Sequence, residues 1–510
     1  MESRSKYAKK NITVGLIYKI LAILLPFINR TIILYTLGVV YTGLGSLFSS
    51  VLQVLNLAEL GFGSAVAFCM YKPIADNDND TVNALLAFYQ KVYRIIGAIV
   101  LAIGVLLMPF LPYLIKGETP DGLNVYILFS IYLLDSVISY VLFAYKTTLL
   151  TANQRNDVVN GILSISTLIK YLAQFVVLLV THNYYLYVSM LPVFTIFNNF
   201  VTDYYSRKLF PQYKCKGTIN KNTKLILNKK IRGLLLSKLC DVARNASDQI
   251  VLSALLGLTA LACYSNYFYI LSSVYGILKV ITTSITASVG NSIASETVEK
   301  NYNDYRKFGF IFAWIRTWCT ICLFCMYQPF MRLWGGDNLV LSNICMLLFC
   351  SYFYGLNMSN YCYLYFEAAG LWNYAKKAYI IQTVVNITLN VVLGKWIGIV
   401  GILIATNVVI FFCDYILQAN ILFERYFTPN YKLDAVKRQV LYIGVTLLSG
   451  IISIIFCVLL TNSIKNHVWV LAIRSAICIV FPNIICYLCY RRSRTFVEAK
   501  EFIKYRIIKR

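Results

Sequence analysis

Three basic side chains lie deep inside stretches that are otherwise apolar enough to cross a membrane. Arg30 stands one turn after Pro26 in the segment LPFINRTIILYTLG, and Lys170 and Lys279 stand within two later apolar runs. A charge at such depth costs about 2.5 kcal/mol or more on insertion scales, so these side chains should face protein or water rather than lipid. A proline kink would make room for water beside Arg30. The structural alternative for Arg30 is a salt bridge to Glu59 in the next predicted helix.

Four further charges follow a helical repeat in the seventh predicted span. Lys238, Asp241, Arg244 and Asp248 recur every three or four residues, which places them on one face of a helix. Their signs alternate, so neighbours can neutralise one another within the helix. We expect this face to line a wet cavity, with a charge-locked contact between two helical bundles as the alternative.

Acidic residues at the same depth are candidates for binding a coupling ion, through protonation or coordination of Na+. Asp135 and Asp248 are the leading candidates, followed by Asp241 and Glu59, although pairing with a neighbouring Lys or Arg is the plainer role. Cations outnumber acids by about eight to five within the predicted spans, which favours an anionic cargo. The charged residues inside those spans are Lys19, Arg30, Lys170, Lys238, Arg244, Lys279, Arg316 and Arg474, and Glu59, Asp135, Asp241, Asp248 and Asp414.

The 15 cysteines and 2 histidines form no recognisable metal or catalytic motif. The close sets Cys319/Cys322/Cys325 and Cys486/Cys489 recur at helical spacing inside apolar runs, whereas a zinc or iron–sulfur site wants four ligands. The sequence therefore predicts packing roles, with no metal site, no cofactor and no catalytic triad. A GxxxxGK[ST] motif is also absent, so any energy source would be a H+ or Na+ gradient, the membrane potential or removal of the product.

Membrane helices must be the elements that position these charges. The 510 residues are 59% hydrophobic and 14% charged, with a mean hydropathy of +0.65. Soluble domains carry about 25% charged residues. A crossing helix needs about 20 mostly apolar residues, and we count about fourteen such runs. The predicted spans are 13–36, 44–70, 91–114, 124–145, 157–180, 184–206, 232–257, 262–290, 308–330, 339–366, 376–394, 399–422, 438–460 and 467–490.

The distribution of Lys and Arg predicts the orientation of these spans. With the N-terminus inside, the cytoplasmic loops and tails hold roughly 35 basic residues against about 4 in the outer loops. This asymmetry accounts for most of the +25 net charge, so nucleic acid is not an expected partner. The first residues, MESRSKYAKK, precede an apolar run without a cleavage site, which favours a first spanning helix over a signal peptide.

A weak internal repeat favours two halves of the same orientation. Aligning INRTIILYTLG (28–38) with SDQIVLSALLG (247–257) superposes a Leu-Gly pair and places polar residues at matching depth. Such a repeat would duplicate six helices and leave two more at the C-terminus. Because six is even, the halves would be related by an axis along the membrane normal.

Two longer segments resemble a known transporter family. GLGSLFSSVLQVLNLAELGFGSAVAFCMYKPIADND (43–78), with AELG followed by YKP and an acidic loop, resembles the second helix of bacterial polysaccharide flippases. DQIVLSALLGLTALACYSNYFYILSSVYGILKVITTSITASVGNSIASE (248–296) is similar to the start of that family's second half. These flippases of O-antigen, capsule and exopolysaccharide repeat units form the polysaccharide transporter family, within the multidrug/oligosaccharidyl-lipid/polysaccharide exporter superfamily. The resemblance extends over the whole chain.

The resemblance implies an all-α inner-membrane protein of bacteria with a V-shaped, pseudo-two-fold pair of six-helix bundles. Its cargo would be an oligosaccharide repeat unit on polyprenyl pyrophosphate, moved from the cytoplasmic to the outer leaflet by alternating access. Arg30, Lys170 and Lys279 would then hold the pyrophosphate, with Arg244 and Arg316 as weaker partners. Membrane lipids, a polysaccharide polymerase and its chain-length machinery would be the surrounding partners.

The expected organisation follows from the spans, and two other functions remain open beside the flippase. An ion-coupled drug or metabolite exporter on the same fold would be expected to line its cavity with carboxylates. A membrane enzyme is disfavoured, because no outer loop exceeds about a dozen residues. The expected parts are 1–206, an N-terminal six-helix bundle; 207–231, a basic cytoplasmic linker; 232–422, a C-terminal six-helix bundle; 423–490, two additional helices; and 491–510, a basic cytoplasmic tail.

Overall fold

The computed structural model describes residues 2–56, 62–117, 119–120 and 122–504. Every regular element in these ranges is a helix. Within them, nine helices are long and apolar enough to cross a membrane, or ten when the bent pair at 125–152 is taken as one span. Each predicted span contains at least one helix among its described residues, so the prediction of an all-α, multi-pass membrane protein is confirmed.

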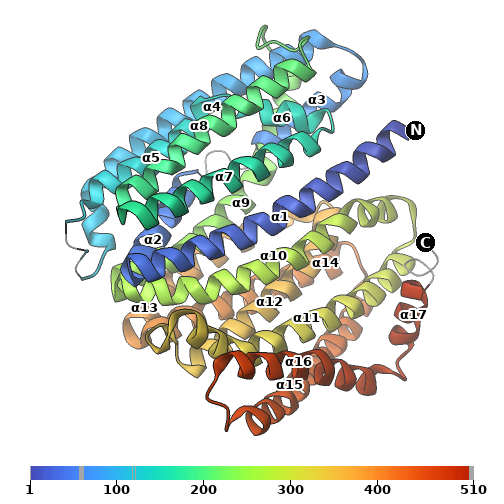
Figure 1. Cartoon of the computed structure of the whole chain (residues 1–510). Helices are drawn as coiled ribbons and strands as arrows, with labels where there is room; N and C mark the ends of the chain where they lie inside the picture. The colour runs from blue at the N-terminus through green and yellow to red at the C-terminus, as the bar shows by residue number, and fades with distance from the viewer. Residues whose placement is uncertain (1, 57–61, 118, 121, 505–510) are drawn as a thin grey trace. The chain divides into compact units, whose positions relative to one another are not determined.

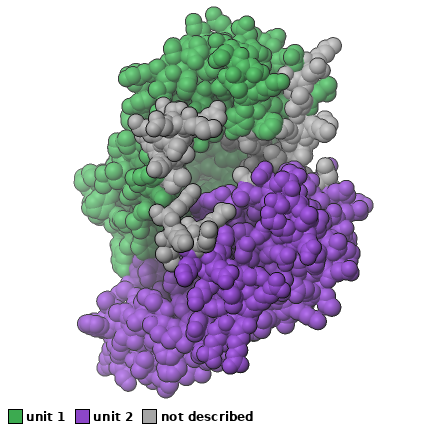
Figure 2. All heavy atoms as spheres, turned by 90° about the vertical axis from the view of Figure 1, so that its right-hand side faces the viewer, with its two compact units in different colours: residues 1–262 green, residues 263–510 purple. Residues whose placement is uncertain are grey.

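The helices form two compact units, residues 1–262 and 263–510, which Figure 2 shows in different colours. In unit 1, α1 lies along α7, α5 packs against α4 and α8, and α2 packs against α9 (Figure 1). The elements of unit 1 are α1 (Glu2–Thr36), α2 (Val39–Leu55), α3 (Phe62–Ala75), α4 (Asn79–Leu107), the short η2 (Met108–Leu114), α5 (Val125–Val141), α6 (Tyr145–Ala152), α7 (Asn156–Thr181), α8 (Tyr184–Leu209) and α9 (Lys221–Leu256).

Unit 2 is built around α11, which packs against α12, α15 and α16 (Figure 1). The boundary between the units falls in the first turns of α10. The elements of unit 2 are α10 (Leu258–Ser295), α11 (Val298–Gly335), η3 (Asp337–Leu339), α12 (Asn343–Ala368), η4 (Leu371–Tyr374), α13 (Lys376–Val408), the π-helical η5 (Val409–Ile416), α14 (Leu417–Arg425), α15 (Pro429–Thr461), α16 (His467–Tyr490) and α17 (Arg494–Ile503).

The fourth predicted span, 124–145, is broken rather than continuous. Helix α5 ends at Val141, and α6 continues after a bend of 47°. At the break Phe143 takes a φ of +50°, an uncommon conformation for a bulky residue. Its ring packs edge-on against Phe200 of α8, and the Arg207 guanidinium lies 6.0 Å from the ring centroid. The break therefore falls in the last turn of the predicted span, which otherwise agrees with α5, and it lies where Phe143 packs against α8.

The residues predicted as a linker, 207–231, are helical over much of their length. Only 210–220 separate α8 from α9, because the lysine-rich sequence that follows has no Gly or Pro to stop a helix. Helix α9 contacts α2 and α3 and is grouped with unit 1, whereas the sequence placed 232–256 in the second bundle. The predicted separation of 376–394 from 399–422 appears as a kink at Gly398, where φ is +61°.

The proposed repeat has a structural counterpart in two glycines. Gly38 joins α1 to α2 with φ +101°, and Gly257 joins α9 to α10 with φ +89°. A Cβ atom at Gly257 would lie 2.7 Å from the Lys116 carbonyl oxygen, so glycine is required there for space as well as conformation. The aligned Leu-Gly pairs thus form the same helix–glycine–helix junction.

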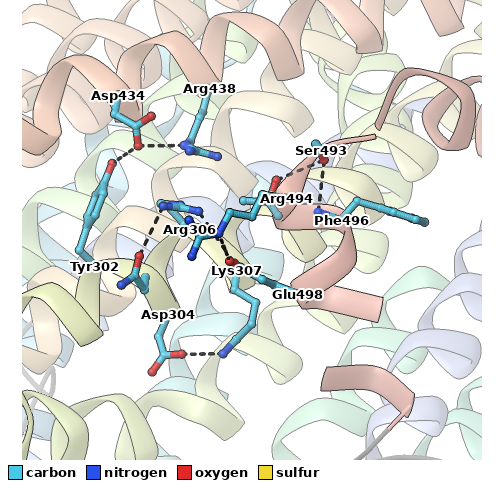
Figure 3. A network of polar contacts seen from close by, with 12 residues as sticks. Tyr302, Asp304, Arg306, Lys307, Asp434, Arg438, Ser493, Arg494, Phe496 and Glu498 are labelled. Atoms are coloured by element: carbon cyan, nitrogen blue, oxygen red, sulfur yellow. Dashed lines mark hydrogen bonds and ion pairs between the residues drawn. The ribbon is translucent and has the colours of Figure 1, made fainter. Parts of the chain in front are cut away.

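A network of paired charges fastens α11, α15 and α17 in unit 2 (Figure 3). Asp434 accepts hydrogen bonds from the Tyr302 hydroxyl at 2.6 Å and from Arg438 Nε at 2.9 Å. Burial acts to raise the pKa of the Asp434 carboxyl, but these hydrogen bonds outweigh it and lower the pKa. Glu498 of α17 lies 3.8 Å from Arg306 and 2.9 Å from Arg494.

Candidate functional site

A polar cavity of about 480 Å³ lies inside unit 1. Its volume falls within the range of small-molecule sites, about 300–1,000 Å³. It is bounded by α3, α4, α7 and α8 and by both sides of the α5–α6 break. The lining residues are Gly63, Tyr89, Tyr93, Ser139, Ala144, Thr147, Thr148, Leu163, Ser166, Thr167, Lys170, Phe194, Thr195, Asn198 and Asn199.

Lys170 is the cation of this cavity and has no ion-pair partner in the described part of the chain. No described carboxylate oxygen lies within 4.0 Å of its ammonium group, whose Nζ is 4.7 Å from the Tyr171 ring centroid. Asp135 acts on Lys170 electrostatically from a greater distance. The Asp135 carboxylate is instead held by the Thr195 hydroxyl, which donates to Oδ1 at 2.5 Å. The structure thus places Lys170 in the lining of this cavity and Asp135 next to it, bonded to the lining residue Thr195.

Three buried polar groups in the cavity wall make no hydrogen bond within the described protein. They are the Ser166 hydroxyl, the Asn198 side-chain oxygen and the Asn199 side-chain nitrogen. A buried polar atom without a partner costs about 1–3 kcal/mol. Groups of this kind can both donate to and accept from a hydroxyl-rich ligand, so this wall is chemically suited to sugar or phosphate oxygens.

The broken span contributes a second source of positive potential. Ala144, Thr147 and Thr148, at the beginning of α6, line the cavity. A helix N-terminus carries about half a positive charge, because its first N–H groups have no partner within the helix. The Lys146 and Thr147 amides of this terminus already donate to the Phe143 and Ala144 carbonyls, so its contribution to an anion site is smaller than that of Lys170.

Arg30 lies in unit 1 beside another polar cluster. Its Nη2 is 3.5 Å from Ser46 Oγ, and it interacts electrostatically with Tyr187. The adjacent Asn29 is buried and donates from Nδ2 to the Tyr187 hydroxyl at 2.6 Å and to Gln174 Oε1 at 3.3 Å. Helix α1 continues through Pro26, and this cluster joins it to α7 and α8.

Arg316, in unit 2, is buried at 3% exposure among neutral partners. Its Nη2 donates to the Tyr354 hydroxyl at 3.1 Å and to Gln439 Oε1 at 3.3 Å, and its guanidinium lies 4.2 Å from the Tyr354 ring centroid. Tyr354 and Thr320 line a neighbouring cavity of about 310 Å³ whose wall is largely apolar. This site differs in chemistry from the polar cavity of unit 1.

Those remaining predicted site residues whose side chains the structure describes do not line the cavity of unit 1. Lys279 is exposed on α10, with its Nζ 5.8 Å from the Tyr275 ring centroid. Arg244 and Asp248 are buried on α9, one helical turn apart. Glu59 and the side chain of Asp241 lie outside the described residues.

The sequence prediction missed most of the cavity wall. Ser166 and Thr195 carried no signal beyond being hydroxyls in apolar runs, and Asn198 and Asn199 were noted only as amides that could bind sugar or join helices. A buried cation outside the cavity lining, Lys146 on α6, was also missed because it falls one residue beyond the predicted span 124–145. The polar stretch YKTT at that point is the signal that could have revealed it.

Comparison with known proteins identifies the fold and leaves the cargo open. No protein-family model and no curated protein matches the sequence. The lipid II flippase MurJ, in an inward closed conformation, matches with a TM-score of 0.63 and 16% identity, over 94% of this chain and 98% of that chain. An inward-facing multidrug resistance MATE family transporter of the MOP superfamily matches with 0.59 and 13% identity, over 77% and 93%. A MATE transporter of Vibrio cholerae matches with 0.57 and 14% identity, over 84% and 99%.

Proposed function

We propose that this protein is a flippase that moves oligosaccharide repeat units on polyprenyl pyrophosphate from the cytoplasmic to the outer leaflet, for polysaccharide biosynthesis. The observation that carries the proposal is the cavity of unit 1, where Lys170 lacks an ion-pair partner in the described structure and unbonded polar groups surround it. A pyrophosphate linked to sugars supplies both the negative charge and the hydroxyls that such a wall can bind. The fold shared with a lipid II flippase supports a lipid-linked cargo of this kind.

The position of the cavity supports a loading role. Its lining residues lie near the middle of α7 and α8 and in the first half of α4. With the N-terminus cytoplasmic, as the basic loops predict, the cavity lies between the bilayer midplane and the cytoplasmic surface. A headgroup arriving from the cytoplasmic leaflet would meet Lys170 before it crossed. Arg30 and Lys279, and more weakly Arg244 and Arg316, are proposed to follow the phosphates during alternating access.

Asp135 is the best-supported ion-coupling residue of this proposal, ahead of Asp248, Asp241 and Glu59. Its carboxylate is half-buried, bonded to a neutral threonine and electrostatically linked to Lys170. Binding of H+ or Na+ at Asp135 would neutralise a negative charge near Lys170 and so strengthen binding of the anionic cargo, and loss of the ion would favour its release. The protein has no role for a cofactor in this scheme.

The test is transport in liposomes. The purified protein is reconstituted and offered a fluorescent polyprenyl-pyrophosphate oligosaccharide, the same glycan on a neutral lipid, or a cationic dye. We expect rapid transbilayer movement of the pyrophosphate form alone. Imposed H+ or Na+ gradients should alter its rate, and Asp135→Asn should abolish that response.

Different outcomes would overturn different parts of the proposal. Gradient-driven efflux of the dye without lipid movement would identify an exporter instead of a flippase. Equal movement of the neutral and anionic lipids would remove the role of the cationic cavity. Lys19→Ala, which removes a charge from α1 of the same unit, near the start of the predicted span 13–36, is the matched control for loss of a basic side chain.

A further inference from the structure

Three cysteines from three different helices meet in the interior of unit 2. Cys325 of α11, Cys457 of α15 and Cys478 of α16 have their Sγ atoms within 4.8 Å of one another. They are 0%, 0% and 1% exposed and lie in one apolar cluster. With metal–sulfur bonds of about 2.3 Å, three sulfurs around one ion stand about 4 Å apart, so this triangle needs little movement to hold one.

The backbone around the three sulfurs is fixed by side chains. The Cys325 carbonyl accepts from Arg474 Nη1 at 2.9 Å, and the Cys478 carbonyl accepts from Trp318 Nε1 at 2.9 Å. The Cys457 carbonyl accepts from the Thr461 hydroxyl at 2.6 Å. Every cysteine of the triangle is therefore held by a hydrogen bond from outside it, as outer partners hold the ligands of a metal site.

Arg474 is a basic residue beside the three cysteines, on α16. It precedes Cys478 by one turn of α16 and bonds only neutral groups, donating from Nε and Nη2 to Thr461 Oγ1 at 3.1 Å. Among the described residues, no carboxylate oxygen lies within 4.0 Å of its guanidinium. Its charge acts directly on Cys457. A cation in a membrane helix is expected to be paired, and the Cys457 thiol is a nearby group that can become negative.

We propose that Cys325, Cys457 and Cys478 bind one soft monovalent metal ion, of the Cu+ or Ag+ class, with Arg474 as its counter-charge. Binding of one such ion with release of two thiol protons gives a bis-thiolate complex of charge −1, to which the third sulfur adds as a neutral thiol. The charge of Arg474 then brings the site to neutrality. Thiolate ligands select soft ions, whereas structural zinc takes four ligands and this group offers three.

The site would fasten the last two spanning helices to the bundle. Cys325 lies on the central helix of unit 2, and Cys457 and Cys478 lie on α15 and α16. One ion would therefore add a further link between three helices that already meet through apolar contacts and through hydrogen bonds, among them that between Thr317 and Thr446, whose hydroxyls are 2.7 Å apart. The inference does not depend on the proposed cargo.

Copper retention tests the site. The full-length protein in detergent is kept reduced, its accessible thiols are blocked with N-ethylmaleimide, and Cu+ is added with a competing chelator. We expect the unaltered protein to retain about one copper per chain, and each of Cys325→Ser, Cys457→Ser and Cys478→Ser to bind it about 10–100-fold more weakly. Cys322→Ser, which alters a thiol that packs against the cluster without belonging to the triangle, is the matched control and should retain copper.

Arg474 variants and X-ray absorption keep the proposal testable if a serine variant fails to fold. Arg474→Gln should weaken copper binding and Arg474→Lys should preserve it. Absorption by the unaltered protein should show sulfur ligands alone, at about 2.3 Å. Retention of copper by all three serine variants, nitrogen or oxygen ligation, or a disulfide within the triangle would each overturn the proposal.

Discussion

The cavity of unit 1 and the charge network of unit 2 differ in whether their charged side chains are paired. In the network, Asp434 and Glu498 each lie within 4.0 Å of an arginine, and Asp304 is 2.6 Å from a lysine (Figure 3). In the cavity, Lys170 has no such partner among the described residues, and three polar atoms beside it are unbonded. Paired charges fix helices to one another, whereas a cation without an ion-pair partner in a polar cavity can still bind an anionic ligand. The network therefore serves to position helices, whereas under the proposed function the cavity is the region that binds cargo.

Removal of the unpaired cation should have the largest effect. We expect Lys170→Ala to slow movement of a pyrophosphate-linked lipid by about 10–100-fold, because one charge-assisted contact worth about 1.5–3 kcal/mol is lost. Lys170→Arg should keep part of the rate, since the charge remains. The measurement is the flipping assay in liposomes at matched protein content. A rate equal to that of the unaltered protein would mean that the cavity is not on the transport path.

A carboxylate introduced next to Lys170 should pair with it, as the charges of the network are paired, and so slow transport. Ser166 precedes Lys170 by four residues on α7, the favourable order for an acid and a lysine on one helix face. We expect Ser166→Asp to slow transport by about tenfold, since its carboxylate would compete with the cargo phosphate for Lys170. Thermal unfolding should show no loss of stability.

Ser166→Asn is the matched neutral control for this change. It has a similar size and polarity but no charge, so transport should stay close to that of the unaltered protein. Equal slowing by Asp and Asn would show that the space at Ser166 matters and the charge of Lys170 does not.

A substitution in the charge network should lower the stability of the protein without slowing transport, and its effect should be the smallest of the three predicted here. Because its pKa is lowered in the folded protein, Asp434 stabilises the fold above its ordinary pKa of about 4 and loses that contribution as pH falls through the lowered value. We expect Asp434→Asn to cost about 1 kcal/mol or less at neutral pH, since the carboxylate is partly exposed. The variant should also lose this acid-range dependence.

Thermal unfolding in detergent between pH 3 and pH 7, about the range over which carboxyl groups titrate, measures this effect. The flipping rate of Asp434→Asn at neutral pH is the companion measurement and should not change. A transport defect as large as that of Lys170→Ala would contradict the division between a positioning region and a binding region.

Much of the fold could be predicted because membrane helices are encoded locally. Each span needs an apolar run of sufficient length, and every such run corresponds to a helix. The break at Phe143 could not be predicted, because it results from packing against Phe200 and Arg207, more than fifty residues away in sequence. The helical start of α9 was missed for a different reason, since a lysine-rich stretch resembles a loop by composition alone.

The candidate site likewise has residues that the sequence could identify and others that it could not. Lys170 and Asp135 could be identified as charges in apolar runs, because their cost in lipid is a property of each residue. The unbonded state of Asn198 and Asn199 could not, because it depends on which helices face them. Cysteine spacing directed attention to Cys319, Cys322 and Cys325, but only Cys325 belongs to the triangle.

The sequence by itself determined that this protein lies in a lipid bilayer, that it is helical, approximately where its spans lie and that charges lie within them. These are one-dimensional properties, because hydrophobicity and charge belong to each residue and the bilayer sets the length. The tertiary structure alone decided which charges are paired, where a span breaks to open a cavity and which three thiols meet. Those features depend on side chains from helices distant in sequence, and no local pattern specifies such distances.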